Sequence, residues 1–108
     1  MIVDVRIYTC KPGKVPEFLA LYEKEAWPFY QKYLGRCVGF YATVDGELNT
    51  VMHQWAFDNA GDREQRRAKL NADPEFKEFL KKLSQSEMLT KMENRIMKPV
   101  DFWQPGQA

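Results

Sequence analysis

The stretch RCVGFYATVDGELNTVMHQWAF (36–57) decides the fold, because it predicts two strands joined by a turn. Its first part alternates, with Val38 and Phe40 on one expected face, and this period of two is typical of a strand. Asp45 and Gly46 form a strong turn signal, and the residues that follow return as a second strand. The two strands are therefore expected to be antiparallel neighbours.

The flanking segments extend this hairpin into a longer pattern. The expected elements are a strand over 2–10, a helix over 16–34, strands over 36–44 and 49–57, helices over 62–70 and from 73 onward, and a strand over 88–97. Pro28 interrupts the first helix and predicts a kink or a restart after Trp27, while Asn59 and Asp73 are expected to cap the later helices. This order predicts an α+β, ferredoxin-like βαββαβ fold with an antiparallel sheet and its helices on one face.

The face of the sheet away from the helices needs a cover. Both sides of strand 36–44 carry few charges, and an apolar face of this kind seldom stays exposed on a monomer. A second copy is the expected cover, so we predict a homodimer. We expect one domain over 1–100 and a tail over 101–108, whose Phe102 and Trp103 are predicted to dock on the partner subunit.

Composition excludes several classes of function. Sixteen basic and fifteen acidic residues leave a formal charge of +1, which argues against nucleic-acid binding. Two cysteines are too few for a disulfide scaffold, and we read both as reduced, which favours the cytoplasm. The N-terminus shows no basic region followed by an apolar stretch, and no apolar run approaches the roughly 20 residues of a membrane span, so no membrane insertion is expected.

His53 is the chain's one histidine and the leading candidate for a catalytic role. It shares an expected strand face with Trp55 and could carry a proton at neutral pH from an ordinary pKa of about 6.5. The alternative is a core histidine with all its hydrogen bonds made. One histidine without clustered carboxylates or cysteines predicts no metal site, and no glycine-rich phosphate loop is present, so no metal or nucleotide cofactor is expected. A haem held by His53 alone remains as an alternative.

Arg6, Tyr8 and Tyr41 are candidates for substrate binding, together with Trp55. Arg6 lies on a strand expected near the sheet centre, where a charge must find a partner. It would either meet an anionic or carbonyl group of a ligand or form an ion pair with Asp4, Glu93 or a helix carboxylate. Whether all four side chains share one face depends on the strand register.

Two other groups of charges have a structural alternative. The basic residues of the polar helix could steer an acidic substrate, but interleaved carboxylates favour a solvated helix with i, i+4 ion pairs; these basic residues are Arg63, Arg66, Arg67 and Lys69. Glu93 is a conceivable base on the last strand, and ion pairing is its alternative.

Six segments in order carry a resemblance to a known family: RIYTCKPGKVPEFLALYE (6–23), LGRCVGFY (34–41), LNTVMHQWAF (48–57), DREQRRAKL (62–70), DPEFKEFL (73–80) and ENRIMKP (93–99). Through these segments the chain resembles the NIPSNAP family along nearly its whole length. The resemblance implies a dimeric α+β barrel, in which two ferredoxin-like sheets face each other. It implies no particular reaction, since related barrels include cofactor-independent monooxygenases, haem-degrading enzymes and isomerases, and some eukaryotic members are tied to mitochondria or act as adaptors.

The sequence supports two classes of function. The first is a homodimer with a pocket for a small apolar or aromatic molecule, on which it acts by monooxygenase-type or isomerase-type chemistry without a cofactor. The second is a binding or interaction protein without catalysis, in which the polar strand residues are structural.

Overall fold

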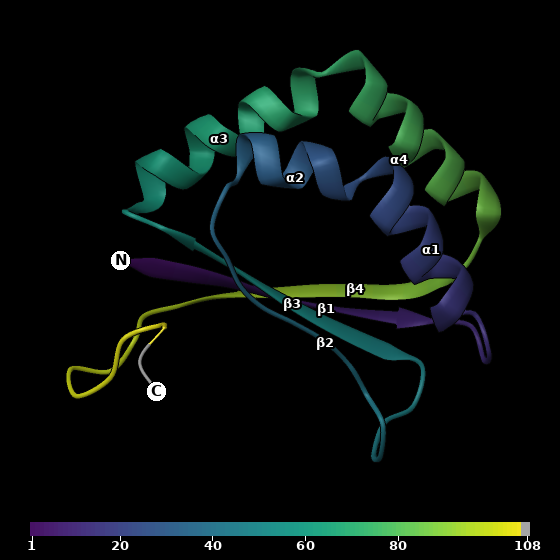
Figure 1. Cartoon of the computed structure of the whole chain (residues 1–108), viewed down its shortest axis with the longest axis horizontal. Coiled ribbons are helices and arrows are strands. Elements are labelled where there is room, and N and C mark those ends of the chain that lie inside the picture. The colour runs from purple at the N-terminus through teal and green to yellow at the C-terminus, as the bar shows by residue number, and fades with distance from the viewer. Residues whose placement is uncertain (107–108) are drawn as a thin grey trace.

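Residues 1–106 form one four-stranded antiparallel sheet with all four helices on one side, as described by a computed structural model (Figure 1). Along the chain the elements are β1 (Ile2–Cys10), α1 (Val15–Glu25), α2 (Trp27–Tyr33), β2 (Cys37–Ala42), β3 (Thr50–Phe57), α3 (Ala60–Ala72), α4 (Pro74–Ser86) and β4 (Leu89–Met97). The strands lie in the order β2-β3-β1-β4, and each neighbouring pair is antiparallel. The ferredoxin-like βαββαβ fold predicted from the sequence is therefore confirmed.

Local signals set the helix ends. The backbone N–H of Ala26 donates to the carbonyl of Tyr22 and ends α1, and Pro28 stands in the first turn of α2, where its missing N–H removes no helical bond. The Oδ1 atom of Asn59 accepts a hydrogen bond of 2.8 Å from the backbone of Asp62. Asp73 caps α4 in the same way through Glu75 and Phe76. Both expected caps are confirmed, and the helix does restart, at Trp27 itself instead of after it.

The core lies between the sheet and the helices and is rich in aromatic side chains. Its buried members include Tyr8, Phe18, Tyr22, Tyr30, Leu34, Val51, Trp55, Phe57, Leu70, Phe76 and Phe79. Each helix contributes to this layer, although α3 buries Leu70 alone. The helix-facing side of the sheet is therefore sealed mainly by packed rings.

An irregular register corrects one expectation about β2. Cys37 pairs with Trp55 and Phe40 with His53, and the register shifts between Cys37 and Gly39. Such a bulge inserts one extra residue into a strand and breaks its alternation. Phe40 packs against the core beneath the helices, while Val38 lines a hollow on the opposite side of the sheet. The expectation that Val38 and Phe40 share a face was wrong.

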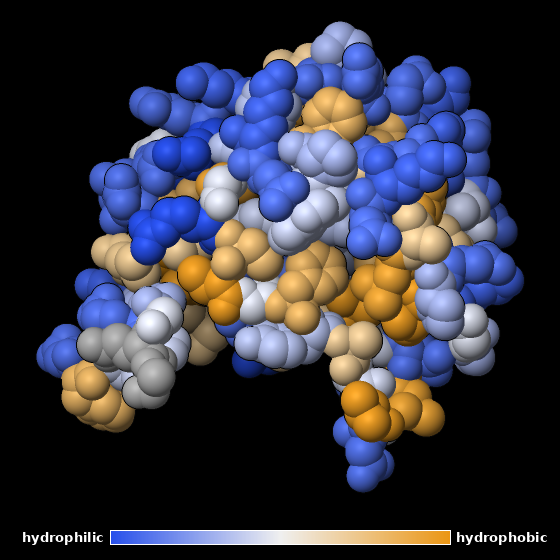
Figure 2. All heavy atoms as spheres, in the orientation of Figure 1, coloured by the Kyte–Doolittle hydropathy of each residue, from blue (hydrophilic) through white to orange (hydrophobic). Residues whose placement is uncertain are grey.

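The side of the sheet away from the helices is hollowed. The segment that follows β4, as far as residue 106, and the β2–β3 connection both project below the sheet (Figure 1), and the surface recedes between them (Figure 2). Val5, Ile7 and Met52 are half-buried on this face. Trp103 and Val3 help to line a hollow of about 230 Å³ there, so the tail contacts its own sheet. Residues 107–108 of the expected tail lie outside the described residues.

No helix within residues 1–106 is both long enough and apolar enough to cross a bilayer.

Candidate functional site

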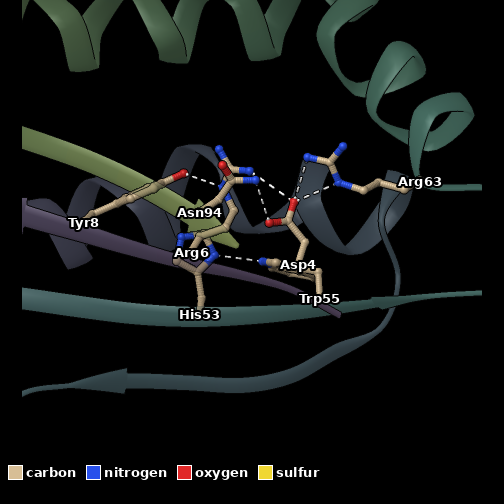
Figure 3. Close-up of polar contacts among 7 residues, drawn as sticks. All are labelled: Asp4, Arg6, Tyr8, His53, Trp55, Arg63 and Asn94. Atoms are coloured by element: carbon tan, nitrogen blue, oxygen red, sulfur yellow. Dashed lines mark hydrogen bonds and ion pairs between the residues drawn. The ribbon is translucent and has the colours of Figure 1, made fainter. Parts of the chain in front are cut away.

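Asp4 is the centre of a polar network between the sheet and α3. Its side chain is fully buried on β1. Oδ2 accepts hydrogen bonds from Arg6 Nη1 at 3.1 Å and from Arg63 Nε at 3.0 Å, and Oδ1 accepts one from Asn94 Nδ2 at 3.1 Å. Figure 3 shows these side chains converging from β1, β4 and α3. One carboxylate thus links two strands to a helix 59 positions away in the chain.

Electrostatics keep this carboxylate ionised. Burial alone would raise the pKa of Asp4, but the hydrogen bond from Asn94 and the charges of Arg6 and Arg63 outweigh it and hold the pKa below its ordinary value. Arg6 also donates from Nε to the hydroxyl of Tyr8 at 3.1 Å. Asp4 is therefore the ion-pair partner of Arg6 among the carboxylates that were expected.

His53 lies on β3 beside this network and is completely buried. Its Nδ1 accepts a hydrogen bond of 2.8 Å from Trp55 Nε1. A neutral imidazole whose Nδ1 accepts must carry its proton on Nε2. This Nε2 has no hydrogen-bond partner anywhere in residues 1–106. The structure therefore holds a buried N–H donor with no acceptor.

The pKa of His53 corrects its expected role. Burial, reinforced by the positive charge of Arg6, lowers the pKa of His53 to about 3. The ring is enclosed by Phe40, stacked at a centroid distance of 5.0 Å, and by Tyr8, edge-on at 4.7 Å. The expectation of an imidazole that titrates near neutral pH was wrong, because water does not reach it in the folded chain. At pH 7 His53 is a neutral hydrogen-bond donor.

An apolar groove opens on the β2 side of His53. It measures about 590 Å³ and is lined by Leu19, Ala20, Tyr22, Glu23, Trp27 and Phe40. Two of its walls, Tyr22 and Phe40, also pack against the imidazole of His53. Within the described part of the chain the buried hydroxyl of Tyr22 has no hydrogen-bond partner, and burial raises its pKa. An apolar groove thus adjoins two buried polar groups that are unsatisfied.

The structure gathers four of the five candidate side chains and separates the fifth. Arg6 pairs with His53 across β1 and β3, and Tyr8 and Trp55 lie on the same helix-facing side. Tyr41 pairs with Met52 on the opposite side and is 60% exposed. The expectation that Tyr41 forms a wall of the same pocket was wrong. It lies instead beside Gly39, where an added Cβ would meet its ring at 2.8 Å.

Tyr22 was not among the candidates from the sequence, while Asp4 was expected only as an ion-pair partner, and Arg63 and Arg67 only as part of a basic cluster on a solvated helix. Arg63, Arg67 and Leu70 follow i, i+4, i+7 spacing, which places them on one face of α3. That spacing indicates an inward face of α3 that carries arginines. The expected i, i+4 ion pair does form on the exposed side of the helix, between Arg66 and Asp62 at 2.8 Å.

Glu93, considered as a base, lies on the sheet face away from the helices. It pairs with Ile7 of β1 and forms an ion pair of 3.5 Å with Lys91. The structure therefore does not bring Glu93 to His53. Among residues 1–106 no three side chains of His, Cys, Asp or Glu cluster in a way that could hold a metal ion.

Comparison with known proteins assigns the family. The NIPSNAP family model matches residues 3–104. The chain belongs to the NIPSNAP family. Protein NipSnap homolog 3A of Homo sapiens is 36% identical over 76 residues, which are 69% of this chain and 30% of that protein. The match thus spans less than a third of the length of this curated relative.

Solved structures extend the NIPSNAP likeness to the whole fold. A NIPSNAP family protein of unknown function from Agrobacterium tumefaciens has a TM-score of 0.90 and 36% identity, and the match covers 97% of this chain and 93% of that one. An uncharacterised NIPSNAP-like domain protein from Burkholderia xenovorans has a TM-score of 0.87 and 37% identity, over 98% and 97% of the two chains. A putative antibiotic biosynthesis monooxygenase from Nitrosomonas europaea shares the fold alone, with a TM-score of 0.65 at 10% identity over 93% and 99% of the two chains.

Proposed function

We propose that this NIPSNAP-family chain forms a homodimer and binds a small apolar or aromatic molecule that carries a carbonyl-type oxygen. The observation that supports this proposal best is the buried Nε2–H of His53, which has no acceptor within the described residues. Leaving a buried donor unpaired costs about 1–3 kcal/mol. A ligand oxygen placed against Nε2 would remove that cost, so the site favours a hydrogen-bond acceptor.

The groove beside His53 fits the apolar part of such a molecule. Its volume of about 590 Å³ lies within the range of small-molecule pockets. Leu19, Trp27 and Phe40 supply apolar walls, and Tyr22 brings a second unsatisfied hydroxyl from the same side. In this arrangement an aromatic body lies in the groove and its oxygen reaches inward toward Tyr22 and His53.

The chemistry open to this site follows from a neutral His53. An N–H donor held in a dry layer stabilises negative charge that develops on a carbonyl oxygen, as in an enolate. Enolate formation is a step of isomerisation and of cofactor-independent oxygenation, so we propose chemistry of this type for a catalytic form of the function. His53 then acts as a donor, and proton removal falls to another group.

A non-catalytic binding protein is the second candidate. Arg6 is already bonded to both Asp4 and Tyr8, and this supports a structural role for the polar strand residues. The free thiols of Cys10 and Cys37 support a reducing location such as the cytoplasm for either candidate.

Two substitutions at His53 test the proposed donor. The side chain of asparagine extends only to the position that Nδ1 occupies in His53. His53→Asn therefore keeps an acceptor for the N–H of Trp55 and removes the donor at the position of Nε2. Glutamine reaches as far as Nε2, so His53→Gln keeps a donor there. We expect His53→Asn to weaken the binding of acetophenone, measured by saturation-transfer NMR, by roughly 2- to 12-fold, the worth of one hydrogen bond. His53→Gln should stay within about twofold of the parent chain.

Ethylbenzene is the matched probe without an oxygen. Its binding should be the same in the parent chain and in both variants, since it makes no hydrogen bond. If His53→Asn weakened the binding of acetophenone and ethylbenzene equally, the substitution would only disturb packing. If acetophenone bound equally well to both variants, His53 would not be the hydrogen-bond donor to the ligand. A dimer that retains no aromatic probe at millimolar concentration would favour the interaction protein.

A further inference from the structure

Two guanidinium groups bond to the carboxylate of Asp4, and a third lies near them on the same helix face. Arg6 and Arg63 both donate to Oδ2 of Asp4, at 3.1 and 3.0 Å. Arg67 lies one helical turn beyond Arg63 on α3, and its charge acts on Arg6 and on His53. Positive charge therefore exceeds negative charge in this part of the interior.

Arg67 is the unsatisfied member of the group. Its Nη1 is buried and has no hydrogen-bond partner within the described chain. Burial, together with repulsion from Arg6, lowers the pKa of Arg67, yet a guanidinium stays charged at neutral pH. The carboxylate of Asp4 bonds to Arg6 and Arg63 and acts on Arg67 only through its charge, so within residues 1–106 Arg67 forms no ion pair of its own. A desolvated cation with a free donor is the complement of an anionic oxygen.

The strand that borders this cluster, β4, is open to solvent. Every residue of β4 from Thr90 to Met97 is exposed, so the helices leave this edge strand uncovered. Met92 and Ile96 flank Asn94 on the helix-facing side and are 54% and 49% exposed. The approach to the arginines is thus bordered by apolar surface.

We propose that the uncovered helix-facing side of β4, next to the arginines of α3, binds the carboxylate of a small amphiphilic acid. Arg67 donates from Nη1 to the carboxylate, and the hydrocarbon part lies along Met92 and Ile96. Asp4 is a positioning residue that holds Arg6, Arg63 and Asn94 in place beside this surface. This site lies on the β4 side of His53, whereas the apolar groove lies on the β2 side, so the two proposals can fail separately.

Calorimetric titration of the full chain with octanoate tests the ligand class. 1-Octanol has the same chain without charge, and inorganic phosphate has charge without a chain. We expect octanoate to bind at least about tenfold more tightly than either probe, because only octanoate uses both the guanidinium and the apolar border. If octanoate and octanol bound with equal affinity, the carboxylate would not be recognised and the proposal of an anion-binding site would be wrong. If octanoate and phosphate bound with equal affinity, the hydrocarbon chain would contribute nothing and the proposal of an amphiphilic ligand would be wrong.

Two arginines on the same helix give a matched pair of variants. Arg67→Met removes the free donor, while Arg66→Met removes the same charge from the exposed side, where Arg66 pairs with Asp62. We expect octanoate affinity to fall about tenfold or more in Arg67→Met and to stay within about twofold in Arg66→Met. If both variants lost the same affinity, octanoate binding would depend only on the net charge of the protein, and Arg67 would not be the residue that binds the carboxylate. If Arg67→Met does not fold, Arg67→Lys and Arg66→Lys allow the same comparison. We then expect the affinity for octanoate to fall several-fold in Arg67→Lys and to stay unchanged in Arg66→Lys.

Discussion

At the scale of single residues, the environment of His53 decides its chemistry. A histidine on an exposed strand would titrate near neutrality, whereas this one is fully buried and receives a hydrogen bond from Trp55. The indole thereby selects the tautomer, and burial selects the neutral form. The side chain that looked like a proton carrier in the sequence is a fixed hydrogen-bond donor in the fold.

The lowered pKa of His53 predicts a pH dependence of stability. Unfolding restores the ordinary pKa of 6.5, against about 3 in the folded chain, so the unfolded state binds a proton first as the pH falls. His53 therefore costs no stability above pH 6.5 and destabilises progressively below it, by about 2 kcal/mol at pH 5. Urea unfolding at pH 7 and pH 5 measures this loss. In His53→Asn the part of the loss due to His53 should be absent, and an unchanged loss would contradict the lowered pKa.

The faces of the site residues were only partly predictable. Two pairs of side chains were predictable from the alternation of a strand, which depends only on neighbouring residues. Arg6 and Tyr8 share one face of β1, and His53 and Trp55 share one face of β3. The position of Tyr41 was not predictable, since it depends on how β2 registers against β3. The contact between Arg63 and Asp4 joins residues 59 positions apart and depends on where α3 settles on the sheet.

At the scale of elements, caps were predictable and packing faces were not. Asn59 and Asp73 cap their helices through bonds to residues two or three positions away, so the sequence contains the whole interaction. The inward face of α3 is different. It presents Arg63 to the sheet because the buried carboxylate of Asp4 on β1 accepts its hydrogen bond, and the sequence of the helix does not contain this information.

The end of α4 predicts a stabilising substitution. Glu87 adopts a left-handed backbone with φ of 55°, a conformation that favours glycine. Its ion pair with Lys11, at 3.9 Å and exposed, contributes little. We expect Glu87→Gly to raise the free energy of unfolding by roughly 0.5–1 kcal/mol, after allowing for the greater freedom of the unfolded chain. The midpoint of thermal unfolding measures this, with a rise of roughly 2–6 °C.

Asn49 provides the contrast for Glu87. It also has a positive φ, of 70°, but its side chain accepts a hydrogen bond from the backbone of Gly13 at 3.0 Å. Asn49→Gly relieves backbone strain and loses this bond, so we expect no gain in stability. If Glu87→Gly and Asn49→Gly raised the free energy of unfolding equally, the hydrogen bond of the Asn49 side chain would contribute nothing to stability.

At the scale of the whole molecule, the hollowed sheet face carries the proposed dimer. Ile7 lies on this face of β1 and is half-buried, with Val5 and Met52 beside it. A lysine at such a position could extend into water in a monomer but would be desolvated between two sheets. We expect Ile7→Lys to convert the dimer to a folded monomer, as measured by light scattering after size-exclusion chromatography at micromolar concentration.

Ala68→Lys is the matched control, because it adds the same charge at an exposed position of α3. It should leave the dimer intact. If Ile7→Lys also remained dimeric with its circular dichroism unchanged, the subunits would have to meet through another surface.

The arginine-lined face of α3 has a consequence for how molecules could enter the interior. Leu70 is the one buried side chain of this helix, so α3 has little apolar contact to hold it in place, whereas α4 buries two phenylalanines. Segments with few buried apolar contacts detach first in native-state fluctuations. Detachment of α3 would hydrate the imidazole while the strands stay paired. Passage to the interior then requires the free energy of releasing one helix and breaking the Arg63–Asp4 ion pair, instead of the free energy of global denaturation.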